Sequence, residues 1–179
     1  MKRFFEKYTF LFLIAGLIVA LDQWTKSLVR NNIPVGVTWL PESLMWLSPY
    51  ARIVNWYNTG AAFGMFQNGS VVFAVLACIV IAAIIYYFPQ VDAKDWTLRL
   101  AMSMQLAGAI GNLVDRLTQN WKVTDFISVG TFAVFNIANA SISVGTAVLL
   151  LGVYLQERAA QKEKAQPGNE NQTDEVTIE

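Results

Sequence analysis

Two asparagines lie three residues apart within the apolar segment 132–143, FAVFNIANASIS. Amide side chains are costly in an apolar environment unless they are hydrogen-bonded. Asn136, Asn139 and Ser143 are at positions i, i+3 and i+7, which places them on one face of a helix. They can form hydrogen bonds between membrane helices, or they can belong to a functional site.

A carboxylate, Asp125, precedes 31 residues without a charge, 126–156. At the edge of an apolar cavity, burial would raise the pKa of this carboxyl group because it disfavours the charged form. Such a pKa suits a general acid or base. A solvated surface aspartate is the alternative interpretation.

The segment 108–117, GAIGNLVDRL, combines small residues with three polar ones. Gly108 and Gly111 allow close packing of helices. Asn112, Asp115 and Arg116 are at i, i+3 and i+4 and can point into one space between helices. The segment predicts either a neutralised Asp–Arg pair at a helix end or an arginine that holds a substrate carbonyl or phosphate group.

Two further polar sets lie near the ends of apolar segments. Asp22 and Lys26 are four residues apart with the acid first, the favourable order for an ion pair on a helix. The pair can simply neutralise itself, or it can organise a site. Asn58 and Gly60 begin the segment NTGAAFG (58–64), in which Asn58 can cap a turn and small residues let backbones approach closely.

The composition excludes several classes of function. The chain of 179 residues contains no histidine and one cysteine, Cys78, so His-based metal sites, Ser-His-Asp triads and disulfides are excluded. The formal net charge is zero, which argues against nucleic-acid binding. We expect no metal and no cofactor. Hydrophobic residues make up 55% of the chain and the mean hydropathy is +0.40, which is typical of a membrane protein.

Four uncharged segments predict four membrane helices near 8–29, 69–89, 97–116 and 136–156, of which the third is the least hydrophobic. The first is not expected to be a cleaved signal peptide, because LDQWTK follows it without a small-x-small cleavage site. Basic residues flank the first and last helices, which predicts that both termini are cytoplasmic.

This topology places residues 30–68 and 117–135 on the extracytoplasmic side of the membrane and residues 89–96 in a cytoplasmic turn. ARIVNWY (51–57) favours a short strand, and LPESLMWL (40–47) a strand or an interfacial turn. We expect a small sheet on the outer leaflet. The domain is assigned to residues 1–157, and the polar residues 158–179 are expected to form a disordered cytoplasmic tail.

Taken in order, DQWTK, NTGAAFG, GAIGNLVDRL, VTDFI and FNIANAS resemble the motifs of the lipoprotein signal peptidase (signal peptidase II) family. The resemblance covers residues 10–157. It implies an all-α membrane protein with four transmembrane helices, a small extracytoplasmic β-cradle and a short outer helix. It also implies an aspartic endopeptidase of the bacterial inner membrane, which removes signal peptides from prolipoproteins just before a lipid-modified cysteine.

The family's chemistry uses two aspartates that share a proton. By resemblance, the first is Asp125, and the second belongs at the last position of the pattern F-N-x-A-D, which is Asn139 in this chain. The resemblance implies that further residues line this pair or belong to the same polar cluster: Asn58, Gly60, Asn112, Asp115, Arg116, Asn136, Ala138, Asp22 and Lys26. Arg116 would steady the peptide or its lipid-bearing end, and Asn136 would orient the peptide or the catalytic groups.

Asparagine has nearly the shape of aspartate but cannot act as a carboxyl acid or base. We therefore expect this chain to bind substrate and to cleave it poorly or not at all. Asn139 can be an engineered inactivating change or the mark of a natural pseudoenzyme. Alternatively, another acid, with Asp115 nearest by motif, can supply the missing carboxylate.

Two hypotheses from different classes follow. One is an impaired intramembrane peptidase that acts on diacylglyceryl-modified prolipoproteins; the other is a non-catalytic protein that binds lipidated signal peptides. A small transporter is disfavoured because no helix is interrupted at its midpoint. The expected partners are a lipid-modified prolipoprotein, membrane lipids and the family's cyclic peptide inhibitors, with no nucleic acid, and the chain is expected to act as a monomer with its site toward the outer face.

Overall fold

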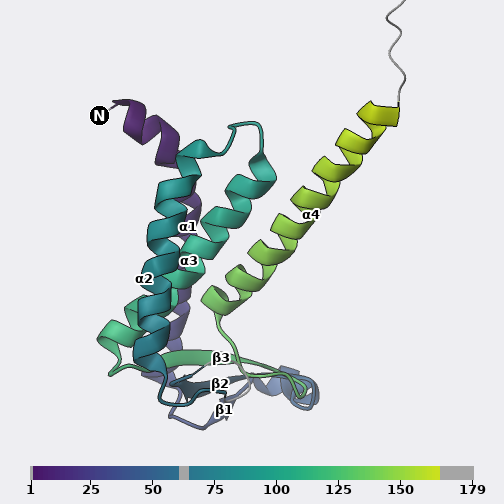
Figure 1. The fold of residues 1–179 in the computed structure, drawn as a ribbon. Coiled ribbons are helices and arrows are strands. Elements are labelled where there is room, and N and C mark those ends of the chain that lie inside the picture. Colours follow the sequence, from purple (N-terminus) through teal and green to yellow (C-terminus); the bar gives the residue numbers. More distant parts are fainter. Residues whose placement is uncertain (1, 61–64, 166–179) are drawn as a thin grey trace, which may run out of the picture.

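The computed structural model describes residues 2–60 and 65–165 and is mostly helical with one small sheet (Figure 1). Four long helices occur in this part of the chain, close to the expected positions. They are α1 (Lys2–Asn32), α2 (Ser70–Tyr87), α3 (Trp96–Thr118) and α4 (Ile137–Ala165). A short 3-10 helix, η3 (Phe88–Gln90), follows α2. The start of α1 and the end of α4 lie at one end of the bundle, and the sheet lies at the other (Figure 1).

Helix α4 extends past the expected domain end at residue 157 to Ala165. Residues 158–165, which the sequence assigned to a disordered tail, are therefore helical. The segment 159–165, AAQKEKA, consists of strong helix formers, which explains the continuation. The remainder of the expected tail, 166–179, lies outside the described residues.

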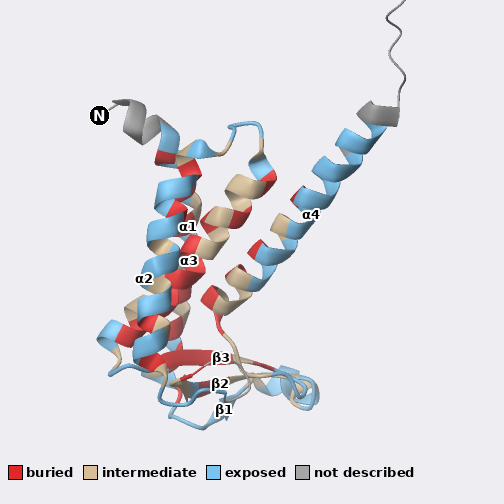
Figure 2. Cartoon of the chain, in the orientation of Figure 1, coloured by how far each residue is buried: buried red, intermediate tan, exposed pale blue. Residues whose placement is uncertain are grey.

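The helices differ in how much of their surface is covered. In the described part of the chain, α1, α2 and α4 are long and apolar enough to cross a membrane. Much of their surface is exposed and apolar (Figure 2). Helix α3 packs against all three of the others and contains many buried residues. Because its neighbours cover it, α3 can carry polar side chains that a lipid-facing helix would not tolerate, and this explains its lower hydropathy.

The sheet has three antiparallel strands in the order β1 (Thr38–Trp39), β2 (Ala51–Asn58) and β3 (Val123–Val129). The strand expected from ARIVNWY is confirmed as part of β2. The segment LPESLMWL, expected to be a strand or a turn, contains the 3-10 helix η1 (Glu42–Leu47), a short helix in the connection between β1 and β2.

Strand β3 was not predicted, because 117–135 was assigned only to a connection. Its residues are buried almost continuously, so the sequence lacks the alternation that marks a strand with one exposed face. The register pairs Trp56 with Asp125 and Asn58 with Val123. This pairing brings Asn58 and Asp125 to the same region of the sheet.

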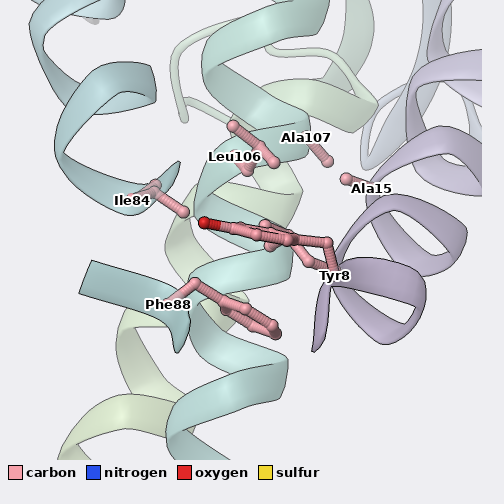
Figure 3. Close-up of a cluster of buried hydrophobic side chains, with 7 residues drawn as sticks. Tyr8, Ala15, Ile84, Phe88, Leu106 and Ala107 are labelled. Carbon is pink, nitrogen blue, oxygen red and sulfur yellow. The ribbon is translucent and has the colours of Figure 1, made fainter. Parts of the chain in front are cut away.

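Two clusters of buried apolar side chains hold the fold together. One lies toward the end of the bundle away from the sheet, where Tyr8 of α1 packs between Ile84 and Phe88 and donates a hydrogen bond to the carbonyl of Ile85 (Figure 3). The other joins the end of α1 to β3 through Val29, Ile33 and Phe126. The second cluster fixes the sheet against the helices and thereby positions the polar residues between them.

Candidate active site

The polar residues singled out from the sequence converge where β3 meets α1, α3 and α4. Asp125 lies on β3, Asn58 ends β2, and Asn136 directly precedes α4. The others come from the three helices: Asp22 and Lys26 of α1, Asn112, Asp115 and Arg116 of α3, and Ala138 and Asn139 of α4. Gly60 lies just beyond Asn58 and donates its N–H to that side chain at 2.8 Å.

Asp125 is held by three amide side chains. Its Oδ1 accepts hydrogen bonds from Nδ2 of Asn136 at 2.7 Å and Nδ2 of Asn139 at 3.2 Å. Its Oδ2 accepts from Nδ2 of Asn58 at 3.0 Å. The residue is only 1% exposed, and this burial raises the pKa of the Asp125 carboxyl group to about 6, against the opposing effects of the Asn58 hydrogen bond and the Lys26 charge.

A chain of hydrogen bonds runs from Lys26 to Asp125. Nζ of Lys26 donates to Oδ1 of Asn112 at 3.2 Å, and Nδ2 of Asn112 donates to Oδ1 of Asn139 at 2.8 Å. Asn139 then donates to Asp125. An ammonium group can only donate and a carboxylate can only accept, so the two ends of the chain fix the orientation of both amides.

The orientation of the Asn112 and Asn139 amides indicates which contacts an aspartate at position 139 would make. Asn112 would still donate to one oxygen of the carboxyl group. The second oxygen would take the place of Nδ2, which lies 3.2 Å from Oδ1 of Asp125. Two carboxyl oxygens this close require a shared proton, because two like charges cannot both persist there. The surroundings of Asn139 therefore suit a carboxyl group as well as an amide.

A second cluster, centred on the fully buried Asp22, Lys26 and Asp115, supports the first. Lys26 Nζ lies 2.8 Å from Oδ2 of Asp22 and 3.5 Å from Oδ2 of Asp115. Oδ1 of Asp22 accepts the N–H of Ala138 at 2.9 Å, where the first turn of α4 favours a negative charge. Oδ2 of Asp115 accepts the N–H of Thr124 at 2.8 Å and so holds β3 one residue before Asp125.

The sequence interpretation missed three members of this cluster. Gln23 Nε2 donates to Asp22, to the carbonyl of Gly111 and to Asp115. Arg30 Nη1 lies 3.5 Å from Oδ1 of Asp115 and 3.1 Å from the hydroxyl of Thr124. A signal was present for Arg30, which is one helical turn after Lys26, whereas Thr124 became visible only once β3 was known.

A cavity of about 690 Å³ opens beside the site, between α2, α3 and α4. Its polar lining includes Asn58, Asn112, Arg116 and Asn139, and most of the rest is apolar. Arg116 lines the cavity, and within the described part of the chain its Nε is buried without a hydrogen-bond partner. Arg116 is otherwise held by the carbonyl of Asn112 and the ring of Phe73.

The remaining site residues lie behind the cavity wall rather than on it. Asp125 is among them and lies behind the lining residues Asn58 and Asn139, which contact it. The others are fully buried and support the lining residues: Asp22, Lys26, Asp115, Asn136 and Ala138. The described residues hold no group of three side chains that could bind a metal ion. The arrangement provides one carboxylate and several amides next to a largely apolar cavity, which is suited to binding and orienting an amide-containing ligand.

The exposed apolar helices and the buried polar site define a membrane protein with a site embedded among its helices. The chain belongs to the signal peptidase II family: the model described as signal peptidase (SPase) II matches residues 14–155. It is a family of aspartic proteases that process lipoproteins.

Individual relatives agree with this assignment. The chain is 34% identical over 157 residues to a lipoprotein signal peptidase of Halalkalibacterium halodurans, covering 86% of this chain and 97% of the relative. It is 37% identical to one from Shouchella clausii, covering 82% and 94%. A solved structure described as a bacterial membrane enzyme matches with a TM-score of 0.72 at 25% identity, covering 91% of this chain and 94% of that one.

Proposed function

We propose that this chain binds diacylglyceryl-modified prolipoproteins through the cavity between α2, α3 and α4, and that it has the framework to remove their signal peptides. The proposal includes four transmembrane helices, cytoplasmic termini, and a site toward the outer face of a bacterial inner membrane. Asp125 and position 139 are the proposed catalytic pair. Family membership and the mainly apolar cavity support this assignment.

The observation that carries the proposal is the contact of Asn139 Nδ2 with Asp125 Oδ1 at 3.2 Å. With an acid in both positions, the ionised carboxylate would take a proton from water, and the protonated one would donate to the peptide oxygen as the water attacks. Asn139 cannot fill either role. Loss of a general acid–base group lowers rates by roughly 10²–10⁴-fold, so the chain as written is expected to bind with little or no turnover.

Asp115 is a poor replacement for the missing acid. Its oxygens are engaged by Lys26, Arg30, Gln23 and the N–H of Thr124, and its side chain is fully buried. The positive charges of Lys26 and Arg30 compensate the charge of Asp115. Asp115 does not line the cavity, and its bond to Thr124 holds β3 in position. This argues against a hidden activity that uses Asp115.

Cleavage of a lipid-modified prolipoprotein, followed by gel shift, tests the proposal. The unaltered chain should show little product and Asn139→Asp should gain roughly 10²-fold or more. The matched control is Asp125→Asn combined with Asn139→Asp, which has one carboxyl group in the pair and should remain inactive. Equal cleavage by the unaltered chain and Asn139→Asp would refute the catalytic pair.

The second candidate function is a non-catalytic binder of lipidated signal peptides. It is favoured by the hydrogen bonds at both ends of the Asn139 amide, whose Oδ1 accepts from Asn112 and whose Nδ2 donates to Asp125. Tight binding of prolipoprotein by the unaltered chain, with no cleavage by Asn139→Asp, would support this function. Cyclic peptide inhibitors of the family are also expected to bind, because Asn139 preserves the shape of the site.

A further inference from the structure

The cavity contains polar groups well away from Asp125. Ser143 and Gln105 line it, and Thr146 contacts Gln105. On α4, positions 139, 143 and 146 follow each other on one face, and Thr146 lies about 10.5 Å along the helix from Asn139. On α3, Gln105 lies the same distance from Asn112. Gln105 and Thr146 thus form a polar pair about two helical turns farther from the sheet than Asn112 and Asn139.

These side chains present hydrogen-bond acceptors. The Ser143 hydroxyl donates to the carbonyl of Asn139 at 3.1 Å, and the Thr146 hydroxyl donates to that of Ile142 at 2.9 Å. Nε2 of Gln105 donates to the Thr146 hydroxyl at 2.9 Å. Throughout the described part of the chain, Oε1 of Gln105 receives no hydrogen bond. The donors are used within the protein, so Oε1 of Gln105 and Oγ of Ser143 are left to accept.

An acceptor in an apolar groove suits a ligand with unpaired N–H groups. A signal peptide in an intact helix offers few, because its backbone N–H groups are bonded internally. A peptide must be extended to bring one bond to a catalytic pair, and each N–H released in an apolar groove is costly unless a partner is provided. At about 3.3 Å per extended residue, 10.5 Å corresponds to three residues.

We propose that Oε1 of Gln105, held in place by Thr146, accepts a main-chain N–H of the signal peptide about three residues before the cleaved bond. Ser143 accepts another nearer to that bond. The inference rests on the proposed function and adds a substrate-binding residue to it. The signal peptide then lies extended between Gln105 and Asn139 and helical beyond Gln105, so Gln105 determines where the helix unwinds.

The test is an ester scan with the full chain in lipid nanodiscs. The probe is a synthetic signal peptide ending in a diacylglyceryl-modified cysteine, with one amide replaced by an ester at each of the five residues before the cysteine. An ester removes one N–H and leaves the side chains unchanged. Binding to the unaltered chain should weaken about 5- to 10-fold at the third residue or its immediate neighbour.

Gln105→Met removes the acceptor and keeps the length of the side chain. It should abolish the ester effect at that residue and leave the others, since two changes that remove the same contact are not additive. The matched control is Leu76→Met, an apolar change in the same cavity, which should preserve the whole pattern.

A flat ester scan with the unaltered chain overturns the inference, whether or not Gln105→Met folds, and leaves the proposed function standing because the peptide still binds. An unchanged scan in Gln105→Met also overturns it. Absence of any binding of the unmodified peptide to the unaltered chain overturns both the inference and the proposed function.

Discussion

Asp125 occupies an unusual position, because a buried carboxylate normally pairs with a cation and this one contacts three neutral amides. Lys26 acts on the Asp125 carboxylate from a distance, and the two are linked by hydrogen bonds through Asn112 and Asn139. Amide donors partly replace the lost water, and burial remains the dominant effect on the pKa. The carboxyl group can therefore change its charge near neutral pH.

The pH dependence of stability should reveal this group. Its pKa is about 6 in the folded chain and 3.8 as an ordinary aspartate, so the folded state binds the proton more tightly. The resulting stabilisation is complete below pH 3.8 and is lost as the pH rises through 6. Relative to Asp125→Asn, the free energy of unfolding should fall by about 2 kcal/mol between pH 4 and pH 8. Thermal denaturation in detergent measures this, and a difference that increases with pH would contradict it.

Lys26 links two buried carboxylates behind the site. Its ammonium group lies between Asp22 and Asp115, and all three side chains are fully buried. Lys26→Met leaves two buried carboxylates without this cation, which should cost about 3–5 kcal/mol. The exposed Lys94→Met serves as the control and should change stability by less than about 0.5 kcal/mol. Equal denaturation temperatures for the two variants would show that Lys26 does not stabilise the fold.

At the scale of the elements, the contact between α3 and α4 sets the geometry of the site. A Cβ atom at Gly108 would lie 2.6 Å from the carbonyl oxygen of Ala138 and closer still to Ile142. At Gly111 it would lie 2.7 Å from Oδ2 of Asp22. Only glycine allows the two helices to approach so closely that Asn112 reaches Asn139 at 2.8 Å.

Gly108→Ala is therefore expected to separate α3 from α4 and to destabilise the chain by about 1–3 kcal/mol. In the Asn139→Asp background it should also lower cleavage, because the pair would be displaced. Gly16→Ala on α1 is the matched control, since a Cβ there meets nothing within 4 Å. That variant should be unchanged or up to about 1 kcal/mol more stable. Similar losses in both variants would argue against a specific helix contact at Gly108.

At the scale of the whole molecule, the sheet and η1 lie at one end of the bundle and both described chain ends lie at the other (Figure 1). Exposed aromatic residues occur toward both ends of the bundle: Trp39 and Trp46 near the sheet, and Tyr86, Tyr87 and Trp96 near the turn between α2 and α3 are all more than half exposed. Trp side chains favour the boundary between membrane and water. This arrangement is expected for a bundle that spans a membrane, and the proposed orientation places the sheet at the outer leaflet.

Cysteine labelling tests this orientation. The exposed native Cys78 is first replaced by alanine. A membrane-impermeant maleimide added to spheroplasts should then modify Trp46→Cys in η1. It should modify Lys94→Cys, between α2 and α3, only after the membrane is broken. The reverse pattern, or labelling of both positions from outside, would refute the proposed topology.

The positions of the helices and the family could be predicted before the fold was known, because long uncharged segments and the five motifs are local features of the chain. The motifs also predict that Asn139 stands where the family has a carboxyl group. The boundary of α4 and the existence of β3 were not foreseen, because one depended on helix propensity beyond the apolar segment and the other on a strand buried on both faces.

The pairing of the polar residues could not be predicted and became visible only in the folded chain. Sequence spacing joins Asp22 to Lys26, but it cannot show that Asp115 meets Lys26 and holds Thr124, or that Asn112 connects Lys26 to Asn139. These contacts join residues far apart in the chain, and they form only because glycines let the helices meet and β3 brings Asp125 beneath them. The residue types indicate which chemistry the site can perform. The order of the hydrogen-bond chain, from the Lys26 ammonium through two amides to the Asp125 carboxylate, arises from packing.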